Sequence, residues 1–315
     1  MEIRDYLRKL LALHWLRPEN AFWRTFDCLL MAQVPFAGKM ADLGCGDGTL
    51  SYIMAGGNLG SYDAFSHVES LDSFNNGSDI YNKVVTGNAL PDLDNSALRH
   101  RYHYGVDHKA GLISKAAMLQ GFYENTLVHD LNLPLPFAAE AYDAAFSNIL
   151  YWLDDINTAL SDWHRILKPS GKLILFVPND NFKEKAWFYY QAPHQGHRSY
   201  YNFFDRGYNG LIRHAYNGGE WEKIFADNGF VVARHVRYLT DPVMEIWNLG
   251  TRPLSPLLIN MAAQLPAEKR AQVKEEWIDY FTRFFHPIIE GEFNKAPREN
   301  EHAFHFFVLE KKSCA

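Results

Sequence analysis

The sequence has few cysteines, no long apolar run and no excess of positive charge. Cys28, Cys45 and Cys314 stand in 315 residues without metal-ligand or redox spacing, which argues against a disulfide scaffold and favours a reducing compartment. No stretch approaches the roughly 18 apolar residues that span a bilayer. The N-terminal residues also lack the pattern of a secretory signal. These absences predict a cytoplasmic protein without a membrane segment.

The charge balance excludes further classes of partner. The formal net charge of -6 at pH 7 disfavours a protein built to bind nucleic acid or anionic lipid, which requires a basic surface. The composition, 47% hydrophobic and 15% aromatic, is that of a globular protein with a full core. The length fits one large domain, or one domain with an appendage. A small molecule is therefore the favoured partner, and the oligomeric state stays open.

The hydrophobic pattern predicts an α/β fold. Apolar residues at helical spacing indicate two helices within residues 1–37. From residue 38 to 178, strands alternate with helices, which is typical of a parallel sheet with helices on both faces. One of these strands is expected over 141–151. Later segments predict a helix and strand at 222–238, two helices between 253 and 286, and a final strand at 302–312.

Two segments interrupt this alternation. Residues 57–102 are rich in Asn, Asp, Ser and Gly and are expected to form an irregular insertion. Residues 182–221 hold 12 Phe, Tyr or Trp in 40 positions, so they must pack against something. On the helix expected around 268–284, the predicted buried face is Val273, Trp277, Tyr280 and Phe284.

A glycine turn, DLGCGDGT, lies between an expected strand that ends at Asp42 and an expected helix that begins near Thr49. Gly44, Gly46 and Gly48 let the backbone turn sharply and let a ligand lie against it. A dinucleotide fingerprint requires glycine at position 49, where Thr49 stands. This substitution disfavours a nucleotide-dependent oxidoreductase.

With Asp42 two residues before the first glycine, the turn resembles motif I of the class I S-adenosylmethionine-dependent methyltransferases. GVDHKAGLISKA, LVHDLNLPLPF and RILKPSGKLIL resemble later motifs of that family in the same order. The likeness covers residues 38–178, with weaker support at 219–238. It implies a Rossmann-like, mostly parallel seven-stranded sheet with helical and aromatic cap insertions, S-adenosylmethionine as cofactor, and methyl transfer as the reaction.

The resemblance also implies how the chain is divided. Residues 1–37 would form a helical lid, and residues 38–178 the cofactor-binding core with the insertion at 57–102. Residues 179–221 would form an aromatic substrate cap. Residues 222–315 would complete the core, with a helical insertion at 241–290.

The implied cofactor contacts lie at the carboxyl ends of the strands. Asp107 would hold the ribose, because a carboxylate accepts from two adjacent hydroxyls. Asp130 would face the adenine amino group, with turn formation as the alternative role. Asp42 either reaches the ligand ammonium through water or ties down its own loop. The expected set is Asp42, Gly44, Cys45, Gly46, Gly48, Asp107, His108, Asp130, Leu131, Asn148 and Arg17.

Two of these assignments have competitors. Glu69 stands at about the 20-residue distance from the glycines where a dinucleotide-type fold places its ribose acid, whereas 58 residues separate Gly48 from Asp107. The later motifs fall into register only with Asp107, which is therefore preferred. Arg17 either reaches the methionine carboxylate of the cofactor or pairs with Glu19.

The aromatic segment favours an apolar, aromatic or glycosyl acceptor. An aliphatic hydroxyl acceptor needs a general base, whereas an acidic oxygen needs only orientation and desolvation. The candidate bases are His197, His194, His214 and Tyr151, and none of them is singled out by the sequence. His100, His103 and His108 lack metal-ligand spacing, so no metal site is expected.

The function expected from the sequence is S-adenosylmethionine-dependent methylation of a small or medium-sized organic molecule, at oxygen. Two alternatives stay open. One keeps the cofactor but takes protein or nucleic acid as acceptor. The other is a non-catalytic module that binds the cofactor without turnover.

Overall fold

A computed structural model describes residues 2–65, 90, 92–188 and 212–312. Seven strands form one sheet in the order β3-β2-β1-β4-β5-β7-β6. They are β1 (Met40–Leu43), β2 (Tyr102–Asp107), β3 (Tyr123–Val128), β4 (Tyr142–Ser147), β5 (Leu167–Pro178), β6 (Phe230–Thr240) and β7 (His302–Lys311). The neighbours from β3 to β5 run parallel, and β7 pairs antiparallel with both β5 and β6. The predicted mostly parallel seven-stranded sheet is confirmed.

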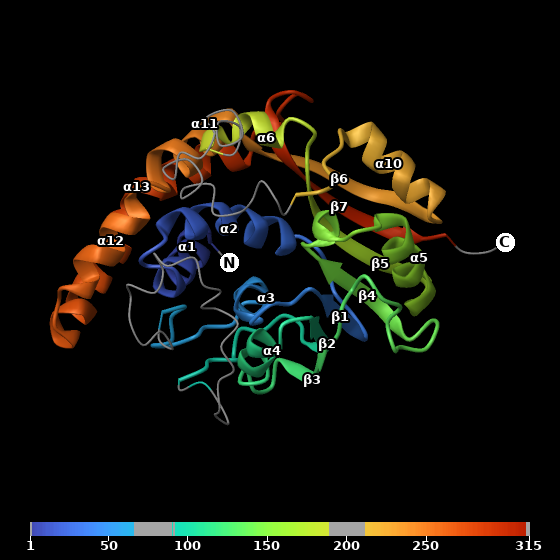
Figure 1. The fold of residues 1–315 in the computed structure, drawn as a ribbon, viewed down its shortest axis with the longest axis horizontal. Coiled ribbons are helices and arrows are strands. Elements are labelled where there is room, and N and C mark those ends of the chain that lie inside the picture. The colour runs from blue at the N-terminus through green and yellow to red at the C-terminus, as the bar shows by residue number, and fades with distance from the viewer. Residues whose placement is uncertain (1, 66–89, 91, 189–211, 313–315) are drawn as a thin grey trace.

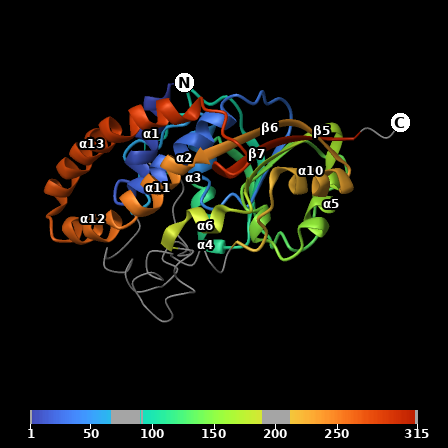
Figure 2. The ribbon, with the colours of Figure 1, turned by 90° about the horizontal axis from the view of Figure 1, so that it is seen from above.

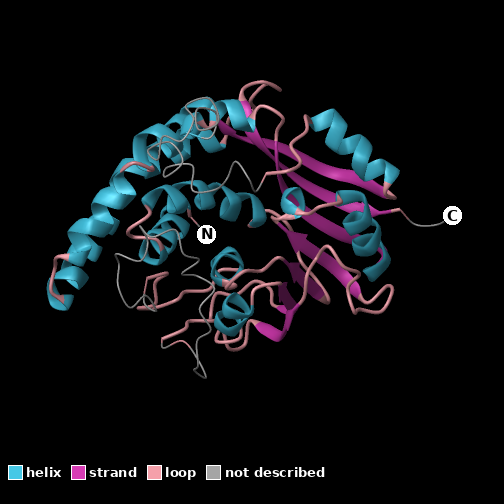
Figure 3. Cartoon of the chain, viewed as in Figure 1, coloured by secondary structure: helices cyan, strands magenta, loops and turns pink. Residues whose placement is uncertain are grey.

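Helices cover both faces of the sheet (Figure 3). One group comprises α3 (Thr49–Met54) and α4 (Ala110–Ala116), together with α1 (Ile3–Leu13) and α2 (Pro18–Met31). The other comprises α5 (Ile156–Ile166) and α10 (Gly218–Asp227), which Figure 2 shows beside each other. Asn228 and Asn157 link the end of α10 to the start of α5 by a hydrogen bond of 2.9 Å. The Asp155 carboxylate caps α5 by accepting from two backbone N–H groups of its first turn.

The two N-terminal helices belong to the same hydrophobic core as the sheet. Leu7, Leu10, Phe22 and Phe26 are all buried within it. Pro18 occupies the first turn of α2, where its missing N–H has no helical partner to lose. The helices α1 and α2 are therefore part of the core. The expected role of residues 1–37 as a lid stays a prediction.

A helical arm follows β6 and forms the outer arc of Figure 1. It comprises α11 (Asp241–Glu245), a π-helical turn (Ile246–Thr251), α12 (Leu254–Ala263) and α13 (Ala267–Phe293). The expected helical insertion at 241–290 coincides with this arm. Within the described residues, no helix combines the length and apolar character needed to cross a bilayer.

Two sequence expectations were wrong in detail. A short 3-10 turn (Leu150–Trp152) follows β4, where a strand was expected through residue 151. On α13, Tyr280 and Phe284 are 63% and 44% exposed, and the buried face consists of Ile278, Phe281, Phe285 and Ile289. Aromatic residues occur on more than one side of this helix, so periodicity alone does not choose the face. Packing against α1 chooses it, with an ion pair between Arg8 and Asp279.

Candidate cofactor site

The glycine loop joins β1 to α3 at the carboxyl edge of the sheet. Its first two backbone N–H groups, of Gly44 and Cys45, both donate to the Val106 carbonyl, at 2.8 and 2.9 Å. Gly46 has a φ of +59°, in the left-handed region that glycine adopts at little cost. A Cβ added to Gly44 would lie 2.2 Å from Ile149, whereas one added to Gly46 would meet nothing within 4 Å. The loop is thus packed behind Gly44 and open in front of Gly46.

Asp107 at the end of β2 fastens this loop. Its Oδ2 accepts from Gly46 N at 3.1 Å and its Oδ1 accepts from Lys109 N at 2.9 Å. The side chain is 12% exposed. Each carboxylate oxygen keeps a further lone pair, so the group can still accept hydrogen bonds from a ligand. Asp107 therefore combines a fixed position with remaining acceptor capacity.

Asp42 lies under the loop. It is 1% exposed and accepts a hydrogen bond from the Tyr123 hydroxyl at 2.6 Å. Burial raises the pKa of its carboxyl to about 6, the Asp107 charge adds to the rise, and hydrogen bonds from Ser51 and Tyr123 oppose it. These contacts join Asp42 to Tyr123 of β3 and Ser51 of α3, and both roles expected for Asp42 stay predictions. Tyr123, which comes from β3, was not anticipated from the sequence.

The ends of β2 and β3 bring a second acid to the same edge. His129 N donates to the Asp107 carbonyl at 2.9 Å. The Asp130 carboxylate accepts from the backbone and side-chain nitrogens of Asn132, at 2.9 and 3.0 Å, and the backbone bond above all holds its pKa low. Asp130 therefore does form the turn considered as its alternative role. The side chain of His108 is 64% exposed, and its Nδ1 lies 3.5 Å from Asp107 Oδ1. Leu131 is buried.

The remaining expected contacts differ in exposure. Cys45 is buried, and burial raises the pKa of its thiol well above the ordinary value, so its contribution to a ligand would be through the backbone. Asn148 is half-buried directly after β4. Arg17 precedes the first turn of α2. Glu19, its alternative partner, is fully buried and accepts a hydrogen bond of 2.7 Å from Ser255 in α12.

The candidate bases divide into described and undescribed residues. Tyr151 is buried, edge-on to Phe304, and its carbonyl accepts from Arg213 N at 3.0 Å. His214 Nε2 lies 3.0 Å from the Leu153 carbonyl and Nδ1 lies 3.3 Å from the Tyr216 hydroxyl. Since a carbonyl only accepts, Nε2 donates and Nδ1 accepts from Tyr216, which engages both nitrogens. His194, His197 and Glu69 lie outside the described residues.

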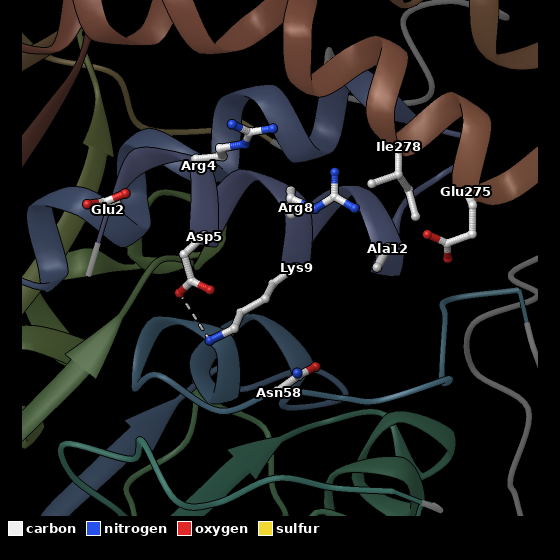
Figure 4. Close-up of a pocket in the computed structure, with 9 residues that line it drawn as sticks. All are labelled: Glu2, Arg4, Asp5, Arg8, Lys9, Ala12, Asn58, Glu275 and Ile278. Carbon is white, nitrogen blue, oxygen red and sulfur yellow. Dashed lines mark ion pairs between the residues drawn. The ribbon is translucent and has the colours of Figure 1, made fainter.

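A charged groove of about 440 Å³ lies elsewhere, between α1, α13 and the segment after α3 (Figure 4). In it Lys9 pairs with Asp5 at 3.2 Å and donates to the Gly56 carbonyl at 3.1 Å. Gly56 follows α3, whereas the glycine loop precedes it. The groove is therefore at the opposite end of α3 from the glycine loop.

Comparison with known proteins agrees with this geometry. The family model described as a methyltransferase domain matches residues 83–175. A malonyl-[acyl-carrier protein] O-methyltransferase 1 from Coxiella burnetii is 33% identical over 193 residues. These matches support the predicted resemblance to the class I S-adenosylmethionine-dependent methyltransferases. The aligned part covers 60% of this chain and 58% of the length of the Coxiella protein.

Two solved structures share this fold. The phosphoethanolamine N-methyltransferase 2 of Haemonchus contortus, in complex with S-adenosylmethionine, matches with a TM-score of 0.51 and 15% identity. The match covers 99% of this chain and 60% of that one. A second structure of that enzyme, with phosphomonomethylethanolamine and S-adenosylhomocysteine, gives a TM-score of 0.50 at 14% identity, over 99% of this chain and 61% of that one.

S-adenosylmethionine is the ligand in the Haemonchus structure, and the residues at the carboxyl edge of this chain suit it. The open side of Gly46 offers room for a ligand against the backbone. Asp107 offers acceptors for hydroxyl donors, and the half-buried Asn148 adds an amide at the end of the next strand. The family model begins at residue 83, so the glycine loop lies outside the matched segment.

Proposed function

We propose that this chain transfers the methyl group of S-adenosylmethionine to an oxygen of a small or medium-sized organic acceptor. The observation that carries the proposal is the hydrogen bond between Gly46 N and Asp107, which joins an open glycine loop to an acidic strand end. Ligands of open parallel sheets bind at this edge. Support for oxygen comes from the name of the Coxiella relative, an O-methyltransferase.

In this proposal, the residues at the strand ends share the work of binding. Asp107 accepts from the two ribose hydroxyls, with Lys109 N and Gly46 N keeping the carboxylate in place. Asp130 and the backbone of Leu131 face the adenine. Gly44, Cys45 and Gly46 offer backbone to the rest of the cofactor, and Asp42 and Gly48 shape the loop.

The cofactor supplies a methyl group bonded to a positively charged sulfur. Transfer is an in-line displacement, in which the bond from acceptor oxygen to methyl carbon forms as the carbon–sulfur bond breaks. The protein's tasks are to align the acceptor and to exclude water. The aromatic segment at 179–221 is the proposed wall of the acceptor pocket.

We further propose that the acceptor oxygen belongs to a carboxylate. Both ring nitrogens of His214 are engaged by protein groups, and Tyr151 is buried. A carboxylate is already ionised at neutral pH, so it requires orientation and no general base. The malonyl group named for the Coxiella relative carries such a carboxylate.

Two measurements test the function. Calorimetric titration with S-adenosylmethionine, S-adenosylhomocysteine and NADH is expected to show binding of the first two only. Turnover with methyl-labelled cofactor is expected with malonyl thioesters or other carboxylic acids and not with their amides. Binding of NADH alone would refute the cofactor assignment. Cofactor binding without transfer to any acid in a broad metabolite screen would favour a non-catalytic module.

Gly46→Ala is expected to weaken S-adenosylhomocysteine binding at least about tenfold. The methyl group enters the open space before the loop, and the positive φ costs about 1–2 kcal/mol of stability. Gly121→Ala is the matched control, because Gly121 has a φ of +75° and its added methyl group would meet only the Asn95 side chain, at 3.3 Å. Both variants should lose similar stability in urea melts, and only Gly46→Ala should lose affinity. Equal affinities would place the ligand elsewhere.

A further inference from the structure

Three histidines meet between β6, β7 and the start of α10. His302 and His305 come from β7 and are fully buried, and His235 comes from β6. His305 Nδ1 lies 3.3 Å from His302 Nε2 and 2.9 Å from His235 Nε2. The carboxylate of Glu299 offers an oxygen in the same place, and the ligand atoms of Glu299, His302 and His305 all lie within 4.8 Å of one another. We refer to these four residues as the histidine cluster.

The outward-facing nitrogen of each ring is held by an acceptor. His302 Nδ1 lies 2.9 Å from the Arg298 carbonyl, and His235 Nδ1 lies 3.1 Å from Glu222 Oε1. His305 Nε2 lies 3.1 Å from Asn179 Oδ1. The amide of Asn179 is oriented by its nitrogen, which donates to the Glu299 and His302 carbonyls. Each outward nitrogen must therefore carry the proton of its neutral ring.

The inward-facing nitrogens are then three lone pairs that point at one another. A neutral imidazole has one N–H, and all three are already used on the outer acceptors. Unpaired acceptors buried this close together repel one another unless a cation lies between them.

The distances suit a metal ion. Zn²⁺ binds imidazole nitrogen at about 2.0–2.1 Å in tetrahedral geometry, which places ligand atoms about 3.3 Å apart. The His302–His305 separation of 3.3 Å equals that spacing, and the His235–His305 separation of 2.9 Å is shorter than it. Histidine ligands of metals donate their second N–H to a carbonyl or carboxylate, as all three rings of the cluster are placed to do.

We propose that the histidine cluster binds a divalent metal ion of the Zn²⁺ type through His235, His302, His305 and Glu299. The Glu299 carboxylate also accepts from Gly218 N at 2.9 Å and pairs with Arg237, and each of its oxygens keeps a lone pair for a metal. Glu299, His302 and His305 form the group of mutually close ligand atoms, and His235 would join it as the fourth ligand through Nε2, 2.9 Å from His305 Nδ1. A site with four protein ligands would be structural rather than catalytic.

The metal would fasten the segment that follows the aromatic cap to the sheet. The backbone of Tyr216 contacts the His305 ring, and a Cβ on Gly218 would lie 2.9 Å from His235. Asn179 directly follows β5, at the other end of the cap. The histidine cluster therefore contacts described residues near both ends of the segment from 179 to 218.

The test uses the untagged full chain, stripped with a chelator and titrated with Zn²⁺ alone. We expect one equivalent per chain by calorimetry and by elemental analysis, and a rise in Tm that grows with Zn²⁺ concentration. His302→Asn and His305→Asn should bind at least about a hundredfold more weakly. Substitution by Co²⁺ should give the strong visible bands of a tetrahedral site.

Two further variants keep the result decisive. Glu299→Gln retains an acceptor for Gly218 N and should fold, yet bind Zn²⁺ at least about tenfold more weakly. His103→Asn removes a surface histidine that pairs with Glu124 at 2.7 Å and should bind Zn²⁺ like the natural protein. Failure to take up one equivalent overturns the proposal. So does equal affinity in the natural protein, His302→Asn and Glu299→Gln. Neither result depends on cofactor binding or methyl transfer.

Discussion

Replacing Asp107 with alanine is expected to weaken S-adenosylhomocysteine binding roughly 10- to 150-fold, or about 1.5–3 kcal/mol. The variant loses charge-assisted hydrogen bonds to the ligand's hydroxyls. It also releases Gly46 N, which holds the glycine loop at 3.1 Å from the carboxylate. Calorimetric titration of both proteins under identical salt measures the change. Glu69→Ala serves as the control and should bind as the natural chain does. The reverse pattern would assign the ribose to Glu69.

A double-mutant cycle separates the ribose contact from the loop contact. A cofactor analogue without the ribose hydroxyls should bind the natural protein weakly. The substitution Asp107→Ala should reduce the affinity for this analogue only a little further, because the analogue already lacks the hydroxyls that the carboxylate would bind. If Asp107→Ala reduces the affinity for the analogue and for the natural ligand by the same factor, Asp107 acts on the loop alone.

Asp42→Asn is expected to change how stability depends on pH. Burial raises the pKa of Asp42 from its ordinary 3.8 to about 6. A raised folded-state pKa gives stability that is present below about pH 4 and is lost as pH rises through about 6. The loss at pH 8 amounts to about 3 kcal/mol, at 1.36 kcal/mol for each unit. Relative to the natural protein, the neutral variant should therefore gain about this much between pH 4 and pH 8.

Urea melts at a series of pH values measure that gain as the difference in unfolding free energy between the two proteins. The substitution also alters hydrogen bonds, but this changes the unfolding free energy by the same amount at every pH and leaves the measured gain unaffected. Asp143→Asn is the matched control with the opposite sign, because Lys168 above all holds the pKa of Asp143 low. If the difference in unfolding free energy between Asp42→Asn and the natural protein does not change with pH, burial does not raise the pKa of Asp42.

The glycine loop was predictable because its chemistry is local. Three glycines between a strand and a helix require a tight turn, and the structure gives all three a positive φ. The order of strands and helices from 38 to 178 was predictable for the same reason, because the spacing of apolar residues within each segment distinguishes a strand from a helix. The face of α13 was not, because its aromatic residues offer more than one apolar side and packing against α1 chooses between them.

The contacts that sequence reasoning missed join distant segments. Tyr123 meets Asp42 across 81 residues, and no pattern around either residue indicates the pair. The histidine cluster is assembled by the antiparallel register of β6 and β7. This register pairs His235 with Phe307 and Arg237 with His305, so His235 and His305 are diagonal neighbours across the two strands. The sequence HAFH places two histidines three residues apart, and a regular strand would point them to opposite faces, so this spacing did not indicate that the two rings meet.

The placement of β7 has a consequence for synthesis of the protein. β7 is the last described strand, yet it lies between β5 and β6 and supplies the pairing of both. β6 therefore emerges from the ribosome before any strand exists for it to join. The five parallel strands can associate as they appear, whereas β6 and the helical arm wait for residues up to 311. During that interval, the edge of β5 that β7 later covers has no partner strand among the described residues.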